Sequence, residues 1–108
     1  MDGMRVSVVV PAYNEEGNIG RVIESAGRAF AEQGLAGEVI VVDDGSSDGT
    51  FGEAIAAAEG RPWVRVVRHR RNRGLTEAME TGFRQARGDV VMLLPGDMES
   101  HPEEDIPK

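Results

Sequence analysis

Four short apolar runs, separated by longer stretches with helical periodicity, organise this chain. The runs cover residues 6–10, 39–42, 63–67 and 90–94. The first two are continuous and rich in β-branched side chains, which is typical of strands buried on both faces, and we expect Pro11 to end the first strand. The intervening residues 17–33, 51–59 and 75–87 carry apolar side chains at the spacing of amphipathic helices. The pattern therefore predicts the element order βαβαβαβ.

Such alternation is typical of the α/β class, with a Rossmann-like parallel sheet and right-handed crossovers. We expect the strand order 3-2-1-4, which reverses direction between the first and fourth strands. Ligands of open α/β sheets bind at such a switch point, beyond the carboxyl ends of the strands. The loops at this position are residues 11–16 and 95–99, with 43–48 beside them. No internal repeat or linker is evident, so we expect residues 1–108 to form a single domain.

Composition narrows the class of protein. The formal net charge of −7 argues against nucleic-acid binding, which favours a basic surface. Cysteine is absent, which excludes disulfides and thiolate metal sites and fits a cytoplasmic protein. No apolar run approaches the length of about 20 residues that spans a membrane. A longer protein that contains this chain and associates with the cytoplasmic face of a membrane is also compatible with these features.

Carboxylates follow three of the predicted strands at the same edge of the sheet. Glu15 follows the first strand, Asp43 and Asp44 the second, and Asp97 and Glu99 the fourth. Carboxylates that share a crevice repel one another unless a cation or a hydrogen-bond donor is present. Their hard oxygen atoms suit Mg²⁺ or Mn²⁺ bound to a phosphate-bearing substrate. The sequence therefore predicts a cofactor of this kind, which would neutralise a diphosphate leaving group.

The same loops carry a family resemblance. Residues 9–16 (VVPAYNEE), 41–50 (VVDDGSSDGT), 72–89 (beginning NRGL) and 94–107 (LPGDMESHPEEDIP) resemble four successive motifs of family 2 glycosyltransferases. The similarity is strongest to dolichyl-phosphate mannose synthases and polyprenyl-phosphate sugar transferases. It covers nearly the whole chain and implies the N-terminal, nucleotide-binding half of a GT-A domain.

The resemblance implies roles for individual residues. Nucleotide-binding roles fall on Pro11, Tyr13, Glu15, Asp43, Asp44 and Arg73. Among these, Asp43 is expected to hydrogen-bond the base. Asp97 matches the second aspartate of the Asp-X-Asp motif and is the expected metal ligand, with Glu99 beside it. No catalytic residue is identified, because the acceptor-binding half and the base of this family lie downstream.

One position departs from the family pattern. Pro95 stands where the family has the first aspartate of Asp-X-Asp, so the site loses a carboxylate. Because the matched motifs belong to the N-terminal half of the family's domain, we expect a half-length domain of a glycosyltransferase. It would bind a nucleoside-diphosphate sugar, whose sugar is transferred with inversion to a polyprenyl phosphate or a hydroxyl group.

Two other classes of function remain open. The first is a non-catalytic module that binds a nucleotide sugar or a partner subunit. The second, a phosphoacceptor signalling domain, is disfavoured because it needs a lysine at a later strand end and the only lysine is Lys108.

An exposed edge of the sheet would favour a homo-oligomer.

The arginine-rich residues 65–73 invite a phosphate or membrane-surface function, but we interpret them as a solvated connection that balances an acidic chain. Within this stretch, His69 is predicted to be a surface residue.

Overall fold

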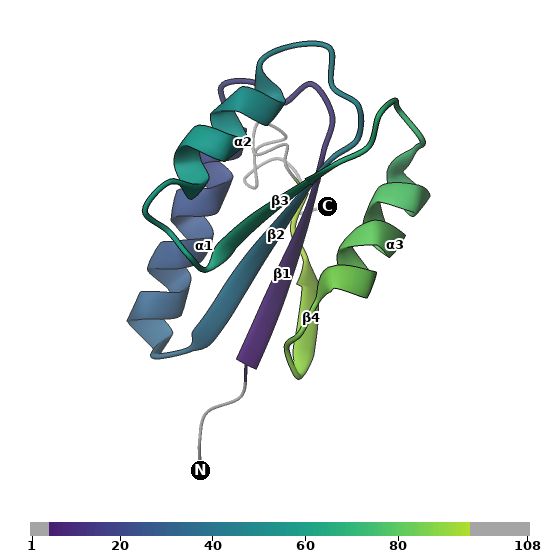
Figure 1. Ribbon diagram of the computed structural model, residues 1–108. Coiled ribbons are helices and arrows are strands. Elements are labelled where there is room, and N and C mark those ends of the chain that lie inside the picture. Colours follow the sequence, from purple (N-terminus) through teal and green to yellow (C-terminus); the bar gives the residue numbers. More distant parts are fainter. Residues whose placement is uncertain (1–4, 96–108) are drawn as a thin grey trace, which may run out of the picture.

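The computed structural model describes residues 5–95, which form one sheet with helices on both faces (Figure 1). The elements are β1 (Arg5–Ala12), α1 (Ile19–Gln33), β2 (Ala36–Asp43), α2 (Thr50–Ala58), β3 (Val64–Arg68), α3 (Leu75–Gln85) and β4 (Val90–Leu93). The predicted order of elements is confirmed. So is the strand order, which is β3-β2-β1-β4 with all neighbours parallel.

The prediction that Pro11 ends the first strand was wrong, because β1 continues to Ala12. The backbone N–H and C=O groups of successive β1 residues point alternately toward β2 and β4. Those of Val9 point toward β4, and so the backbone of Pro11, two residues further on, also faces β4. The pairing of β1 with β4 ends at Val9 and Leu93, so the missing N–H of Pro11 interrupts no ladder bond. The strand can therefore carry Pro11 to the edge of the sheet.

Register aligns the carboxyl ends of three strands. Ala12 of β1 lies opposite Asp43 of β2, and Asp43 lies opposite Arg68 of β3. The loops that follow these strands therefore leave the sheet at the same level. The switch point between β1 and β4 lies at this edge, as the strand order requires.

The two faces of the sheet have separate cores. Helices α1 and α2 cover one face and α3 covers the other (Figure 1). Consecutive residues of β1 alternate between them: Val8 and Val10 pack beneath α1, whereas Val9 packs beneath α3. Both faces of β1 and β2 are covered, which explains their continuous apolar runs.

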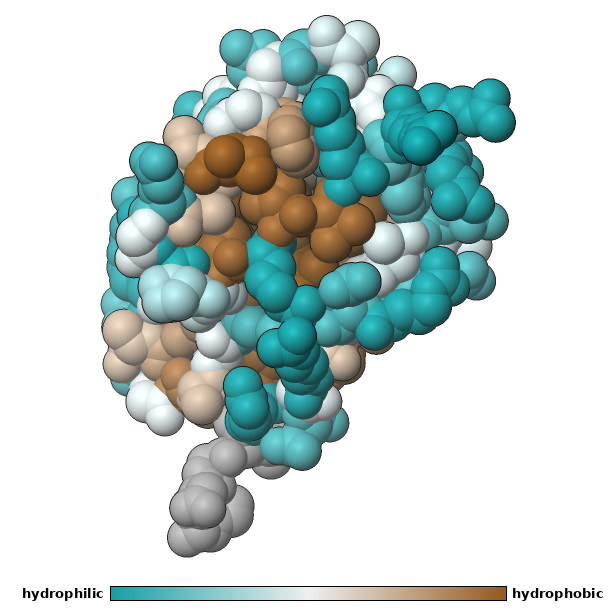
Figure 2. All heavy atoms as spheres, viewed as in Figure 1, coloured by the Kyte–Doolittle hydropathy of each residue, from teal (hydrophilic) through white to brown (hydrophobic). Residues whose placement is uncertain are grey.

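Both edges of the sheet expose apolar side chains. Figure 2 shows an apolar patch over the edge strand β3, where Val66 and Val67 are half-buried and Ile55 of α2 is 45% exposed. At the opposite edge, the four residues of β4 are 37–54% exposed. Pairing with a second copy along an edge stays a prediction. Within residues 5–95, no helix has both the length and the apolar character needed to cross a membrane.

Close packing of α3 on β1 leads to a prediction about stability. Gly82 is buried, and a Cβ atom there would collide with the Val9 side chain. We expect Gly82→Ala to lower the free energy of unfolding by about 1–3 kcal/mol, because an overpacked core must shift. Gly52 of α2 is the matched control: its Cβ would meet nothing within 4 Å. There, alanine is expected to raise stability by roughly 0.5–1 kcal/mol.

Urea unfolding of both variants checks this expectation. A Gly82→Ala variant as stable as the unmodified chain would show that α3 does not pack on β1 at this distance.

Candidate functional site

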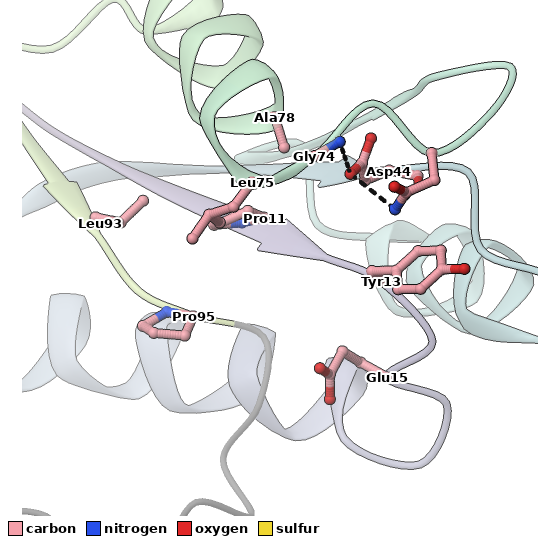
Figure 3. A pocket seen from close by; sticks show the side chains of 10 residues that line it. Pro11, Tyr13, Glu15, Asp44, Gly74, Leu75, Ala78, Leu93 and Pro95 are labelled. Atoms are coloured by element: carbon pink, nitrogen blue, oxygen red, sulfur yellow. Dashed lines mark hydrogen bonds between the residues drawn. The ribbon is translucent and has the colours of Figure 1, made fainter.

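A cavity of about 520 Å³ lies at the switch point between β1 and β4. It is lined by Pro11, Tyr13, Glu15, Asp44, Asn72, Gly74, Leu75, Ala78, Leu93 and Pro95. These residues come from the ends of β1, β2 and β4 and from the beginning of α3. Figure 3 shows that the apolar side chains gather toward one end of the cavity and the polar ones toward the other. The volume is in the usual range for small-molecule sites.

The loop after β1 is held against the loop after β2. The N–H of Asn14 donates to Ser46 Oγ at 2.8 Å, and Asn14 Oδ1 accepts from the N–H of Ser47 at 2.9 Å. Asn14 adopts a left-handed backbone conformation with φ of 52°, which asparagine tolerates. The N–H of Glu15 donates to Thr50 Oγ1 at 2.7 Å. The backbone at Asn14 and Glu15 is therefore held in place before any ligand arrives.

Two glutamate carboxylates accept hydrogen bonds from backbone N–H groups near the starts of α1 and α2, next to the same loops. Glu16 Oε1 accepts from the N–H of Gly49 at 2.9 Å, immediately before α2. In return, the Glu53 carboxylate accepts from the N–H groups of Gly17 at 2.6 Å and Gly20 at 2.8 Å, at the start of α1. Glu16, in the loop before α1, thus lies beside the positive end of α2, and Glu53 of α2 lies at the positive end of α1. These hydrogen bonds stiffen one side of the cavity.

Asp44 is 3% exposed and anchors the opposite wall. Its Oδ1 lies 2.8 Å from His69 Nδ1 and accepts from the N–H of Arg73 at 2.9 Å. Its Oδ2 accepts from Asn72 Nδ2 at 3.1 Å and from the N–H of Gly74 at 2.9 Å. Burial by itself raises the pKa of Asp44, but the hydrogen bonds from His69 and from the N–H groups of Arg73 and Gly74 outweigh burial and hold the pKa below its ordinary value of 3.8. Asp44 is therefore an ionised acceptor whose two oxygens each receive two partners.

Asp43 is fully buried and is not among the residues that line the cavity. Its Oδ1 accepts weakly from the N–H of Ser46 at 3.4 Å. Its Oδ2 lies 3.3 Å from Arg68 Nε, close enough for an ion pair but without hydrogen-bonding geometry. Arg68 in turn lies over the Phe51 ring, 4.3 Å from its centroid. The Asp43 carboxylate is therefore shielded from solvent, with the half-exposed Arg68 side chain beside it.

Arg73 lies beside the cavity but does not line it. It lines a neighbouring hollow of about 370 Å³ together with Arg68, His69, Arg70 and Arg71. Its Nη2 is 3.4 Å from Glu77 Oε1, one helical turn further along. The prediction that His69 is a surface residue was wrong: the ring is 7% exposed, because polar partners on two other elements enclose it.

Several cavity residues were given no individual role by sequence reasoning. They are Asn72, Gly74, Leu75, Ala78 and Leu93. Four of them lie in residues 72–89, the third of the four motifs that resemble the family, so this motif was the available signal. Its geometry could not be anticipated, since the contacts to Asp44 span about 30 positions of sequence.

The described residues supply few ligands for a metal ion. Within residues 5–95, no three His, Cys, Asp or Glu side chains gather closely enough to hold a cation. Glu15 and Asp44 are the carboxylates of the cavity, and Asp44 already accepts four hydrogen bonds. The predicted ligands Asp97 and Glu99 lie outside the described residues.

Sheet order, helices on both faces and a cavity at the switch point together define the Rossmann-like half of a GT-A-type domain. The sequence profile of glycosyl transferase family 2 matches residues 7–108. The chain belongs to this family.

Similar proteins point in the same direction. The dolichol-phosphate mannosyltransferase of Pyrococcus furiosus is 40% identical over 105 residues, covering 97% of this chain and 29% of the relative. The undecaprenyl-phosphate 4-deoxy-4-formamido-L-arabinose transferase of Pseudomonas aeruginosa is 43% identical over 105 residues, covering 95% and 30%. A mannosyltransferase from Pyrobaculum calidifontis, solved in complex with GDP-Man and Mn²⁺, superposes with a TM-score of 0.71 at 34% identity, covering 88% of this chain and 28% of that structure.

The chain therefore spans about three tenths of the length of these relatives. The other seven tenths have no counterpart in the 108 residues.

Proposed function

We propose that this chain binds a nucleoside-diphosphate sugar in the switch-point cavity and serves sugar transfer, with inversion, to a polyprenyl phosphate. One observation carries the proposal: Pro11, Tyr13, Glu15 and Asp44, which come from two separate motifs, line one cavity at the ligand-binding edge of the sheet. Tyr13 is 46% exposed there and offers a flat ring to a nucleobase.

A divalent cation, Mg²⁺ or Mn²⁺, is the proposed cofactor. It would neutralise the charge that develops on the diphosphate leaving group. Asp97 and Glu99 are the proposed ligands, and Glu15 is a carboxylate that lines the cavity. The Mn²⁺ complex of the related mannosyltransferase supports a cation of this kind.

The names of the related enzymes favour a polyprenyl phosphate as the acceptor over a hydroxyl group of a glycan. A phosphate oxygen is already ionised near neutral pH and needs less help from a general base than a hydroxyl group. This fits a chain in which no catalytic base is assigned. A cytoplasmic location, on the cytoplasmic face of a membrane in a longer protein, completes the proposal.

Calorimetric titration with UDP- and GDP-sugars, with and without Mn²⁺, tests the binding step. We expect heat of binding with one nucleotide class, and a roughly tenfold loss of affinity in Tyr13→Ala because a stacked aromatic ring contributes about 1–3 kcal/mol. Phe83→Ala is the matched control, because Phe83 is also 46% exposed but does not line the cavity. Absence of heat with every nucleotide, or equal losses in the two variants, would contradict the proposal.

A second candidate is a non-catalytic module that binds a nucleotide sugar. The observation that favours it is Pro95, which lines the cavity where the family carries an aspartate. Binding without transfer, in a chain extended by its natural downstream sequence and supplied with polyprenyl phosphate, would select this candidate.

A further inference from the structure

Three elements of the fold meet at the His69 side chain. His69 follows β3, Asp44 follows β2, and Thr81 lies within α3. The ring nitrogens reach both partners, with Nδ1 2.8 Å from Asp44 Oδ1 and Nε2 2.8 Å from Thr81 Oγ1. His69 is 7% exposed and Asp44 is 3% exposed, so water competes little for these bonds.

The hydrogen-bond partner of His69 Nδ1 shows which group donates in this contact. Asp44 is an acceptor, so His69 Nδ1 carries a hydrogen and donates it to Oδ1. Nε2 is hydrogen-bonded to the Thr81 hydroxyl, which can donate to this nitrogen or accept from it. Both ring nitrogens of His69 are therefore hydrogen-bonded to side chains of other segments.

The cluster reaches the cavity by two routes. Through Asp44 it holds Asn72 and Gly74, which line the wall, by hydrogen bonds of 3.1 Å and 2.9 Å. Through Thr81 it holds α3 one turn beyond Ala78, which lines the same wall. The loop that carries the wall has a glycine at 74 with φ of 102°, so its backbone is not restrained by a side chain there.

We propose that His69 is a positioning residue for nucleotide binding: it locks the Asp44 carboxylate to α3, so that the wall formed by residues 72–78 is in place before the ligand arrives. This inference rests on the proposed function of the cavity. His69 itself does not line the cavity and touches no ligand in this role.

Hydrogen exchange of the ligand-free chain, followed residue by residue by NMR, tests the locking step without any nucleotide. In His69→Leu, which keeps bulk but removes both hydrogen bonds, we expect the protection of the Arg73 and Gly74 amides to fall at least tenfold. The Leu35 amide, which donates to Phe30 on the far side of the sheet, serves as the internal reference. His69→Asn retains a donor near the Nδ1 position and is expected to recover most of the protection.

Thr81→Val supplies a milder variant in case His69→Leu does not fold. It removes only the bond to Nε2 and is expected to loosen α3 while the Asp44 contact persists. Titration of the same variants with UDP and GDP in the presence of Mn²⁺ should give a roughly tenfold weaker affinity for His69→Leu and a smaller loss for His69→Asn.

The outcomes separate this inference from the proposed function. If the unmodified chain binds neither nucleotide, the proposed function fails, and the exchange data still report whether His69 holds the wall. Unchanged protection at Arg73 and Gly74, or an equal fall at Leu35, overturns the inference. It is also overturned if His69→Asn behaves like His69→Leu in both measurements.

Discussion

Replacing Asp44 with alanine is expected to lower the free energy of unfolding by about 3 kcal/mol or more, the largest loss among single polar substitutions in the described residues. The carboxylate accepts from His69, Asn72 and the backbone N–H groups of Arg73 and Gly74. Each donor left without a partner in a buried place costs about 1–3 kcal/mol. Solvent entering the loop offsets part of that sum. Urea unfolding measures the loss, and nucleotide affinity should fall with it because Asn72 and Gly74 line the cavity.

Asp48→Ala is the matched control for that substitution. Asp48 also accepts hydrogen bonds from a helix start, at the N–H and hydroxyl of Thr50, but it is exposed. Its removal should cost less, because water can replace the lost acceptor. Equal losses in the two variants would mean that the Asp44 contacts contribute no more than an ordinary helix cap.

Acid provides a second measure of the same contacts. Burial raises the pKa of Asp44, but its hydrogen bonds lower the pKa by more than burial raises it. The pKa in the folded chain is therefore below 3.8. A carboxyl group whose folded pKa is depressed stabilises the fold fully above its unfolded value, and that stabilisation disappears as pH falls through the folded value. We therefore expect stability to decline below about pH 4, and to decline less steeply in Asp44→Ala. The stability of Asp44→Ala should still decline in acid, because Glu38 and Asp48 also have lowered pKa values in the folded chain.

Introducing a carboxylate at position 95 is expected to strengthen cation-assisted binding. Pro95 lines the cavity, and the family has an aspartate at this point of its Asp-X-Asp motif. Two opposite charges about 4 Å apart interact by about 1–4 kcal/mol per unit charge near a protein surface. Pro95→Asp should therefore tighten the binding of a nucleoside diphosphate by about tenfold or more with Mn²⁺ present, and leave it unchanged or weaker without the metal.

Pro95→Asn is the control, because it has nearly the same shape as the aspartate variant without the charge. Calorimetry with UDP and GDP, in Mn²⁺ and in EDTA, measures both variants. An equal gain in Asn and Asp, or a gain that persists in EDTA, would show that the cation does not bind near this position.

Local pattern was sufficient for the architecture. The periodicity of residues 17–33 and 75–87 is a property of each segment by itself, so both helices were predicted within a few residues of their observed bounds. The strand order 3-2-1-4 was expected from the same alternation of strands and helices, which is typical of Rossmann-like sheets. The extension of β1 through Pro11 did not follow, because it depends on where the neighbouring strand β4 stops.

The sequence pattern does not distinguish the surroundings of two adjacent aspartates. Asp43 and Asp44 stand in one motif, and both were predicted to bind the nucleotide, which stays a prediction. The structure separates their surroundings: Asp43 is buried beside Arg68, whereas Asp44 lines the cavity. Successive residues at a strand end point to opposite sides, and which side opens toward the cavity depends on how α3 and its loop pack.

The chain by itself therefore determined the elements, their order and the set of motifs gathered at one edge of the sheet, because short-range periodicity and chain connectivity carry that information. The tertiary structure alone decided that His69 is buried, that Asp44 holds the wall of the cavity and that Asn72 and Gly74 form it. Those facts rest on hydrogen bonds between residues about 12 to 30 positions apart, and a one-dimensional pattern does not encode such contacts.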